Sequence, residues 1–130
     1  MSQENVELVR RVYEGWSRGD FSEGAAFDPD VEFEMVDWPA PARSRGVEAM
    51  RRTWQTTLSA WDDFRAAPDD FVDYGKNVLV LNSIRARGKG SGAEVSAQTA
   101  TVWTIEAAKV VRLALYWDTA LAAEAAQRQD

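Results

Sequence analysis

The chain has 130 residues, of which 45% are hydrophobic and 28% charged, and these totals fit one compact domain spanning residues 1–130. Fifteen basic against twenty-one acidic residues give a net charge of −6, which excludes the basic surface that nucleic acids need, so we expect no nucleic-acid partner. The absence of cysteine and histidine excludes disulfides, thiol chemistry, a histidine base and the commonest zinc ligand. We therefore expect no metal and no cofactor, and any acid–base chemistry would rest on Asp, Glu, Tyr or Lys.

The first segment of the chain is amphipathic and predicts a helix. Ser2 can cap it, Glu4 lies in its first turn, and Gly19 and Asp20 mark its end. Apolar side chains recur along it every three or four residues: Leu8, Val9, Val12, Tyr13 and Trp16. The segment contains no apolar signal core, and no apolar run in the sequence has the length of a membrane span. We therefore expect a cytoplasmic protein that does not contact a membrane.

Residues 31–35 alternate between apolar and acidic side chains, which predicts a strand with one buried face. Continuing the alternation puts Asp37 on the apolar face, just before Trp38 and the proline-containing loop of residues 39–46. A poorly solvated carboxylate at the rim of a cavity could serve as a general base. The alternative is that the strand has already ended and Asp37 caps the following turn. The sequence leaves both interpretations open.

Helices and strands are also predicted beyond that loop. The apolar stripe of a second helix consists of Val47, Met50, Trp54, Leu58 and Trp61. Strands are predicted near residues 64–71 and over residues 77–87, 94–106 and 109–118, with a glycine-rich turn at 88–92 and a tight turn at 107 and 108. A last helix begins at Thr119, with Asp118 or Thr119 as its N-cap. This order indicates an α+β fold with helices packed on one face of a curved sheet.

The chain contains, in this order, the segments NVELVRRVYEGWSRGD, DPDVEFEM, GVEAMRR and KVVRLALYWDTALAAEAA. Together they resemble the SnoaL-like polyketide-cyclase branch of the nuclear-transport-factor-2-like (NTF2-like) superfamily, which includes ketosteroid isomerases. The resemblance implies a cone-shaped curved antiparallel sheet, N-terminal helices packed on its concave face, a pocket between them, and usually a homodimer through the outer sheet face. Members include isomerases, dehydratases, epoxide hydrolases, cyclases and proteins that only bind a ligand. The resemblance therefore predicts the fold and leaves the activity to the pocket residues.

The ketosteroid isomerase pattern has a tyrosine on the first helix, a base aspartate on the first long strand and an acid aspartate on a later strand. The resemblance puts these three positions at Val12, Met35 and Thr101, which lack the required groups. Isomerisation by that mechanism is therefore not expected. Asp37, two residues beyond Met35 on the same strand face, is the remaining candidate for a catalytic base.

Alternation along the later strands predicts which side chains face inward. Asn82 interrupts an apolar row, and a buried amide needs a partner, either a ligand or a side chain such as Thr101. The predicted substrate-binding residues are Trp16, Met35, Trp54, Asn82, Thr101, Trp103 and Trp117. The alternative is that most of these tryptophans belong to the core, with two of them touching a cavity.

The leading hypothesis is a pocket protein that binds a small apolar carbonyl-bearing molecule. If it is catalytic, Asp37 would remove a proton next to the carbonyl while Asn82 or Thr101 steadies the enolate oxygen, and Tyr13 is a further candidate donor. The alternative is a non-catalytic binding module or dimeric scaffold. We also expect a homodimer, because the outward strand faces carry an apolar set that consists of Leu79, Leu81, Ala100, Val102, Ala114 and Tyr116.

Overall fold

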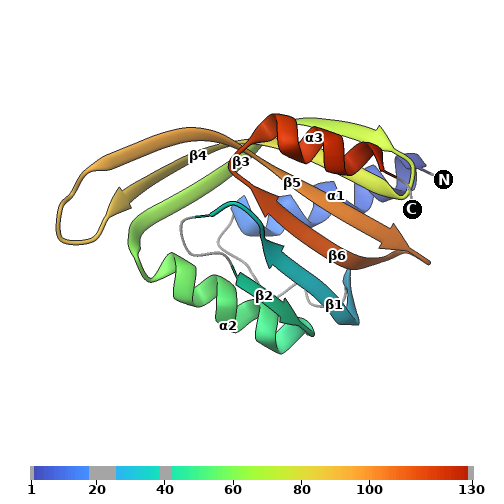
Figure 1. The fold of residues 1–130 in the computed structure, drawn as a ribbon, viewed down its shortest axis with the longest axis horizontal. Helices are drawn as coiled ribbons and strands as arrows, with labels where there is room; N and C mark the ends of the chain where they lie inside the picture. The colour runs from blue at the N-terminus through green and yellow to red at the C-terminus, as the bar shows by residue number, and fades with distance from the viewer. Residues whose placement is uncertain (1, 18–25, 39–41, 129–130) are drawn as a thin grey trace.

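The computed structural model describes residues 2–17, 26–38 and 42–128, which form three helices and six strands (Figure 1). In chain order these are α1 (Ser2–Ser17), β1 (Phe27–Met35), β2 (Ala42–Arg45), α2 (Val47–Leu58), β3 (Trp61–Tyr74), β4 (Asn77–Gly88), β5 (Glu94–Glu106), β6 (Lys109–Tyr116) and α3 (Thr119–Gln127). The predicted helix end at Gly19 and Asp20 and residues 39–41 of the predicted loop lie outside the described residues. None of the helices described is both long and apolar enough to cross a membrane.

The six strands form one curved, unclosed sheet in the order β2-β1-β6-β5-β4-β3, which confirms the predicted α+β fold class (Figure 1). Strands β3 to β6 pair with their sequence neighbours in antiparallel register. The turn between β5 and β6 uses Ala107 and Ala108, which adopt the positive φ values of 51° and 62° that a two-residue hairpin requires. Strand β1 instead lies parallel to β6, with Phe33 opposite Leu113. The resemblance implied an antiparallel sheet, and this one pair departs from it. The two strands are far apart in the sequence, so no hairpin forces them to be antiparallel.

Helices cover both faces of the sheet. In Figure 1, α3 lies in front of the sheet and α1 lies behind it. The inner core, on the concave face, joins Val9 and Val12 of α1 to Trp103 of β5 and Leu113 of β6, and Trp117 packs against it. This confirms the prediction that Trp103 and Trp117 lie on the concave side. The inner core also receives α2, so α1 and α2 share this face.

The outer core lies under α3, whose start is as predicted. The carboxylate of Asp118 accepts hydrogen bonds from the backbone N–H groups of Ala120 and Leu121 at 3.0 and 3.1 Å, which caps the helix. Ala122 and Ala126 then pack on a set of outward side chains: Leu79, Ala100, Val102, Ala114 and Tyr116. Each of these five is at most 5% exposed in the single chain. Leu81, the sixth residue of the predicted outward set, is partly buried beside them. The premise of an open apolar surface therefore fails for five of the six residues, and the homodimer that rested on it stays a prediction.

Three element boundaries differ from the sequence-based expectation. Strand β1 begins at Phe27 and not at Val31. Strand β2 forms within the segment expected to be a loop and pairs with β1, placing Ser44 opposite Phe33. The second helix ends at Leu58, and Trp61 instead begins β3 opposite Gly88. Trp61 misled the prediction because its position fits both the helical spacing of α2 and the start of β3.

Candidate functional site

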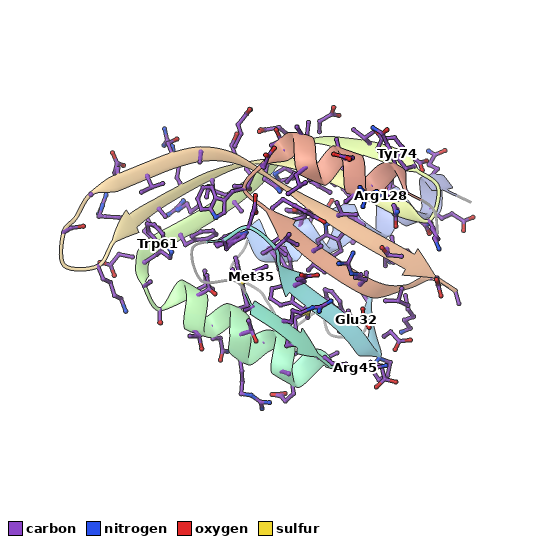
Figure 2. The ribbon with its side chains drawn as sticks, in the orientation of Figure 1. Glu32, Met35, Arg45, Trp61, Tyr74 and Arg128 are labelled. Carbon is purple, nitrogen blue, oxygen red and sulfur yellow. The ribbon has the colours of Figure 1, made fainter. Side chains whose placement is uncertain are left out.

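A cavity of about 1070 Å³ lies between the concave face of the sheet and helices α1 and α2. Most of its wall is apolar. The aromatic residues in it are Tyr13, Trp16, Phe27, Phe33, Trp38, Trp54, Trp61 and Phe64, and the larger aliphatic ones include Met50, Leu58, Leu113 and Leu115. Figure 2 labels Trp61, which borders the cavity where β3 begins, and Met35 at the end of β1. A cavity of this size and lining has the character of small-molecule sites in proteins.

Tyr13, Thr101 and Trp103 form a hydrogen-bonded chain in the wall of this cavity. Tyr13 Oη and Thr101 Oγ1 lie 2.9 Å apart, and Trp103 Nε1 donates to Thr101 Oγ1 at 2.7 Å. Tyr13 and Thr101 border the cavity, whereas Trp103 is fully buried. The two hydroxyls thus form a polar spot in an otherwise apolar wall.

This chain leaves one hydroxyl proton without an acceptor. Thr101 Oγ1 already accepts from Trp103 Nε1, and one of the two hydroxyls donates to the other. The Asn82 amide is the other polar group beside the Tyr13 hydroxyl, and it lowers the pKa of Tyr13 as a hydrogen-bond donor does. Among the residues described, no acceptor within hydrogen-bonding distance takes the second hydroxyl proton. The pair can therefore donate one hydrogen bond to a molecule in the cavity, whichever of the two hydroxyls supplies it.

Tyr13 stays protonated in the folded chain. Burial raises the pKa of Tyr13 well above its usual 10.0, and hydrogen bonds with Thr101, Asn82 and Trp103 offset only part of that effect. At neutral pH the side chain is consequently a hydrogen-bond donor and acceptor, and it cannot act as a base.

Asn82 carries a buried acceptor without a partner. The residue is 2% exposed, borders the cavity, and lies opposite Pro68 of β3 and Thr99 of β5. Its Nδ2 makes a long contact of 3.4 Å with the carbonyl of Val80, while its Oδ1 has no hydrogen-bond donor in the described part of the chain. An unsatisfied buried polar atom costs about 1–3 kcal/mol, so this oxygen needs an explanation.

A second group of unpaired atoms belongs to a tryptophan cluster at the α2 end of the cavity. The ring of Trp38 lies 6.1 Å from that of Trp54 and 5.1 Å from that of Trp117, and Trp54 contacts Phe64 at 5.6 Å. The indole Nε1 atoms of Trp38, Trp54 and Trp117 are buried and lack an acceptor among the described residues. Trp38 and Trp54 border the cavity, and Trp117 supports Trp38 from behind.

Asp37 holds the junction between β6 and α3. Its Oδ1 accepts the backbone N–H of Trp117 at 2.7 Å, and its Oδ2 accepts that of Asp118 at 2.9 Å. Both oxygens thus serve the main chain, and Asp37 is not among the described residues that border the cavity. The geometry suits the capping interpretation, although the capped amides belong to the β6–α3 junction and not to the turn that follows Asp37. The catalytic role of Asp37 stays an untested prediction.

Comparison with known proteins places this architecture in a family. A model of the SnoaL-like domain matches residues 9–113. This chain belongs to the SnoaL-like family. No protein of curated function matches the sequence of this SnoaL-like chain.

Solved structures share the fold over almost the whole chain. An NTF2-like protein of unknown function from Burkholderia pseudomallei has 24% identity and a TM-score of 0.79, covering 96% of this chain and 98% of its own. A protein from a Jannaschia species, proposed to be a SnoaL-like polyketide cyclase, has 17% identity, coverages of 99% and 95%, and a TM-score of 0.79. TerC, co-crystallised with polyporic acid, has 19% identity, coverages of 96% and 99%, and a TM-score of 0.78. Identities this low establish the fold and not the activity.

The predicted substrate-binding residues divide into two groups in the structure of this SnoaL-like chain. Trp16, Trp54, Asn82 and Thr101 border the cavity together. The other three, Met35, Trp103 and Trp117, are not among its described lining residues; they lie in or against the inner core behind it. They are placed to support the wall and not to form its surface.

Two residues that border the cavity are absent from the predicted substrate-binding set. The isomerase resemblance pointed to Val12, which is fully buried, whereas the neighbouring Tyr13 brings its hydroxyl to Thr101. The helical spacing of Tyr13 and Trp16, three residues apart, was the signal that both share one face. Trp38 was noted only as the neighbour of Asp37, and no sequence pattern predicted that it would reach the cavity.

Proposed function

We propose that this SnoaL-like chain binds a small aromatic molecule in its cavity and recognises a carbonyl oxygen on it. The observation that carries the proposal is the hydroxyl pair of Tyr13 and Thr101, which retains one proton to donate inside an aromatic wall. A carbonyl oxygen accepts such a hydrogen bond and carries no proton of its own. The aromatic wall favours ring-containing guests, because aromatic pairs add attraction beyond the burial of area.

A hydroxyl or N–H group next to that carbonyl would also satisfy Asn82. Its unpaired Oδ1 is an acceptor, and the side chain of Asn82 also interacts with the Tyr13 hydroxyl. The preferred guest therefore has a donor beside its carbonyl acceptor. The co-crystal of TerC with polyporic acid supports the general idea that this fold accommodates a small organic molecule.

We leave catalysis out of the proposal. Both oxygens of Asp37 are held by main-chain N–H groups. Among the described residues that border the cavity, the one carboxylate is Asp63, which pairs with Arg65 at 3.0 Å. No carboxylate in this set is free to remove a proton from a bound guest, so binding is the function that the geometry supports best.

Calorimetric titration with deoxybenzoin and bibenzyl tests the proposal. The two compounds share two phenyl rings and differ in the carbonyl group of deoxybenzoin. We expect deoxybenzoin to bind about fivefold to tenfold more tightly, which corresponds to one net hydrogen bond of about 1 kcal/mol. The double variant Tyr13→Phe, Thr101→Val removes both hydroxyls and should abolish this preference, whereas each single variant identifies the donating hydroxyl.

Tyr116→Phe is the matched control, because Tyr116 is similarly buried, at 5% exposure, but lies in the outer core under α3. It should leave the preference for deoxybenzoin unchanged. Circular dichroism melting confirms that each variant is folded. Equal affinity of the wild-type protein for the two compounds, or a preference that survives the loss of both hydroxyls, contradicts the proposal.

A further inference from the structure

The tryptophan cluster supplies a second polar end to the cavity. Trp38 and Trp54 border the cavity, and the indole N–H group of each is buried without an acceptor among the described residues. An indole N–H is a donor only, so nothing but an acceptor atom on a guest or a water can satisfy it. Tyr13, Asn82 and Thr101 belong to α1, β4 and β5, whereas Trp38 follows β1 and Trp54 lies on α2. One guest in this cavity can therefore meet polar groups that come from several elements of its wall.

The charges around the cavity favour a negatively charged acceptor. The charged side chains that border it, among the described residues, are Arg51, Arg65, Arg85 and Asp63. Three guanidinium groups thus border the cavity against one carboxylate, in a chain whose net charge is −6, although Arg51 already has a partner of its own and Arg65 pairs with Asp63. Arg51 precedes Trp54 by three residues on α2, so the two side chains share the face that borders the cavity. A cation beside two N–H donors favours an anionic oxygen over a neutral one.

We propose that Trp38, Trp54 and Arg51 form a carboxylate-binding subsite, so that the guest of this cavity is an aromatic keto acid with its carboxylate at the α2 end. This inference rests on the proposed function, because it assigns the second end of the same guest. The carboxylate oxygens accept from the two indole N–H groups, while the carbonyl at the other end accepts from the Tyr13–Thr101 pair. A guest with both groups satisfies donors that no described residue satisfies.

Titration with three related compounds tests the subsite. They are deoxybenzoin, deoxybenzoin with a para carboxylate on one ring, and the methyl ester of that acid. The wild-type protein should bind the acid about tenfold more tightly than the ester, as expected for a hydrogen-bonded charge in a partly buried site. The advantage should shrink as salt is added, because the Arg51 charge is screened.

Three variants locate the carboxylate. Trp38→Phe and Trp54→Phe keep an aromatic ring but remove the N–H group, and each should reduce the affinity for the acid more than the affinity for the ester, which loses only contact area. Trp16→Phe is the matched control: Trp16 also borders the cavity, but its Nε1 is not among the unpaired buried atoms. This control should change the affinities for acid and ester alike. Arg51→Gln should reduce the preference for the acid and its salt dependence even if a tryptophan variant is poorly folded.

The outcomes separate the two proposals. If deoxybenzoin binds but the acid binds no better than the ester, water or nothing satisfies the indoles, and the carboxylate subsite is overturned. A preference for the acid that survives Trp38→Phe, Trp54→Phe and Arg51→Gln also overturns it, because the carboxylate then lies elsewhere. If none of the three compounds binds, the proposed function fails and the subsite fails with it.

Discussion

Two buried asparagines on the same strand show how differently the two faces of the sheet are used. Asn77, at the start of β4, donates from Nδ2 to the carbonyls of Ala126 and Arg128 at 3.1 and 2.9 Å and accepts from Thr104 Oγ1 at 2.8 Å. Asn82, five residues later and on the concave side, has an unpaired Oδ1, a long contact with the carbonyl of Val80 and an interaction with the Tyr13 hydroxyl. Both are at most 5% exposed. Burial alone therefore does not distinguish a structural amide from one that can receive a guest; the count of satisfied hydrogen bonds does.

The same contrast extends to the neighbouring polar groups. Near α3 the polar side chains make hydrogen bonds that stabilise the fold. Asn77 bonds to the end of the helix, and Asp118 caps its start. Asp37 accepts from the backbone N–H groups of Trp117 and Asp118, just before the helix. On the cavity side, one hydroxyl proton of the Tyr13–Thr101 pair and the oxygen of Asn82 stay unused. We infer that the outer face is built for stability, whereas the inner face gives up some stability to keep its polar groups available.

The largest difference between the two faces is expected in the free energy of unfolding when each asparagine is replaced by leucine. Asn77→Leu removes three hydrogen bonds and leaves two carbonyls and a hydroxyl without partners, so we expect the free energy of unfolding to fall by about 3 kcal/mol. Asn82→Leu removes an amide that is already poorly satisfied and should change the free energy of unfolding by less than about 1 kcal/mol. Urea unfolding of both variants measures the difference. Equal losses would show that the two amides are equally important to the fold.

A smaller effect is expected for Asp37→Asn. The substitution keeps the shape but turns an amide NH₂ group toward one of the backbone N–H groups of Trp117 and Asp118, so we expect a loss of about 1–3 kcal/mol in unfolding free energy. Affinity for deoxybenzoin should be unchanged, because Asp37 does not border the cavity. A folded Asp37→Asn protein with weakened binding would instead place the carboxylate at the guest, as the catalytic interpretation requires.

The pH dependence of stability offers a second comparison, between Tyr13 on the inner face and Tyr116 on the outer face. Burial raises the pKa of Tyr13 strongly and that of Tyr116 as well. Between the unfolded value of about 10 and the raised folded value, the unfolded chain releases a proton that the folded chain keeps. This contribution to stability is therefore complete below pH about 10 and falls as the pH rises beyond it, by up to about 1.4 kcal/mol per pH unit for one tyrosine.

The variant Tyr13→Phe should make this decline in stability shallower. Unfolding measurements between pH 8 and pH 11 can detect the change, because this range spans the ordinary tyrosine pKa of about 10. Tyr116→Phe should have a similar but smaller effect. A decline that is identical in the wild-type protein and in Tyr13→Phe would mean that Tyr13 is not buried as described.

The sequence predicted those features that depend on local patterns. Strict alternation gave β4 and β5 and the inward row that contains Asn82 and Thr101, and the helix-capping pattern gave Asp118. It could not predict partners that the fold brings together over long distances. Asp37 meets amides 80 and 81 residues away, and Tyr13 meets Thr101 across 88 residues.

The placement of α3 shows the same limit. Its sequence predicts a helix, but the alternation of the strands cannot say whether that helix or a second copy of the chain covers the outward apolar residues. For this reason the sequence predicted that Leu79 and Ala114 belong to an exposed apolar patch, although α3 packs on them. The pairing of hydrogen-bond donors with acceptors, which separates Asn77 from Asn82, likewise needs coordinates.

The most direct test of the account is a calorimetric titration of the wild-type and Asn82→Leu proteins with benzoin and deoxybenzoin. Benzoin adds one hydroxyl next to the carbonyl and so offers the donor that Asn82 Oδ1 lacks. We predict that the wild-type protein binds benzoin about fivefold more tightly than deoxybenzoin and that Asn82→Leu loses this preference while remaining as stable as the wild type. Equal affinities of the wild-type protein for the two compounds, or a preference that persists in Asn82→Leu, would contradict the claim that the inner face keeps its polar groups for a guest.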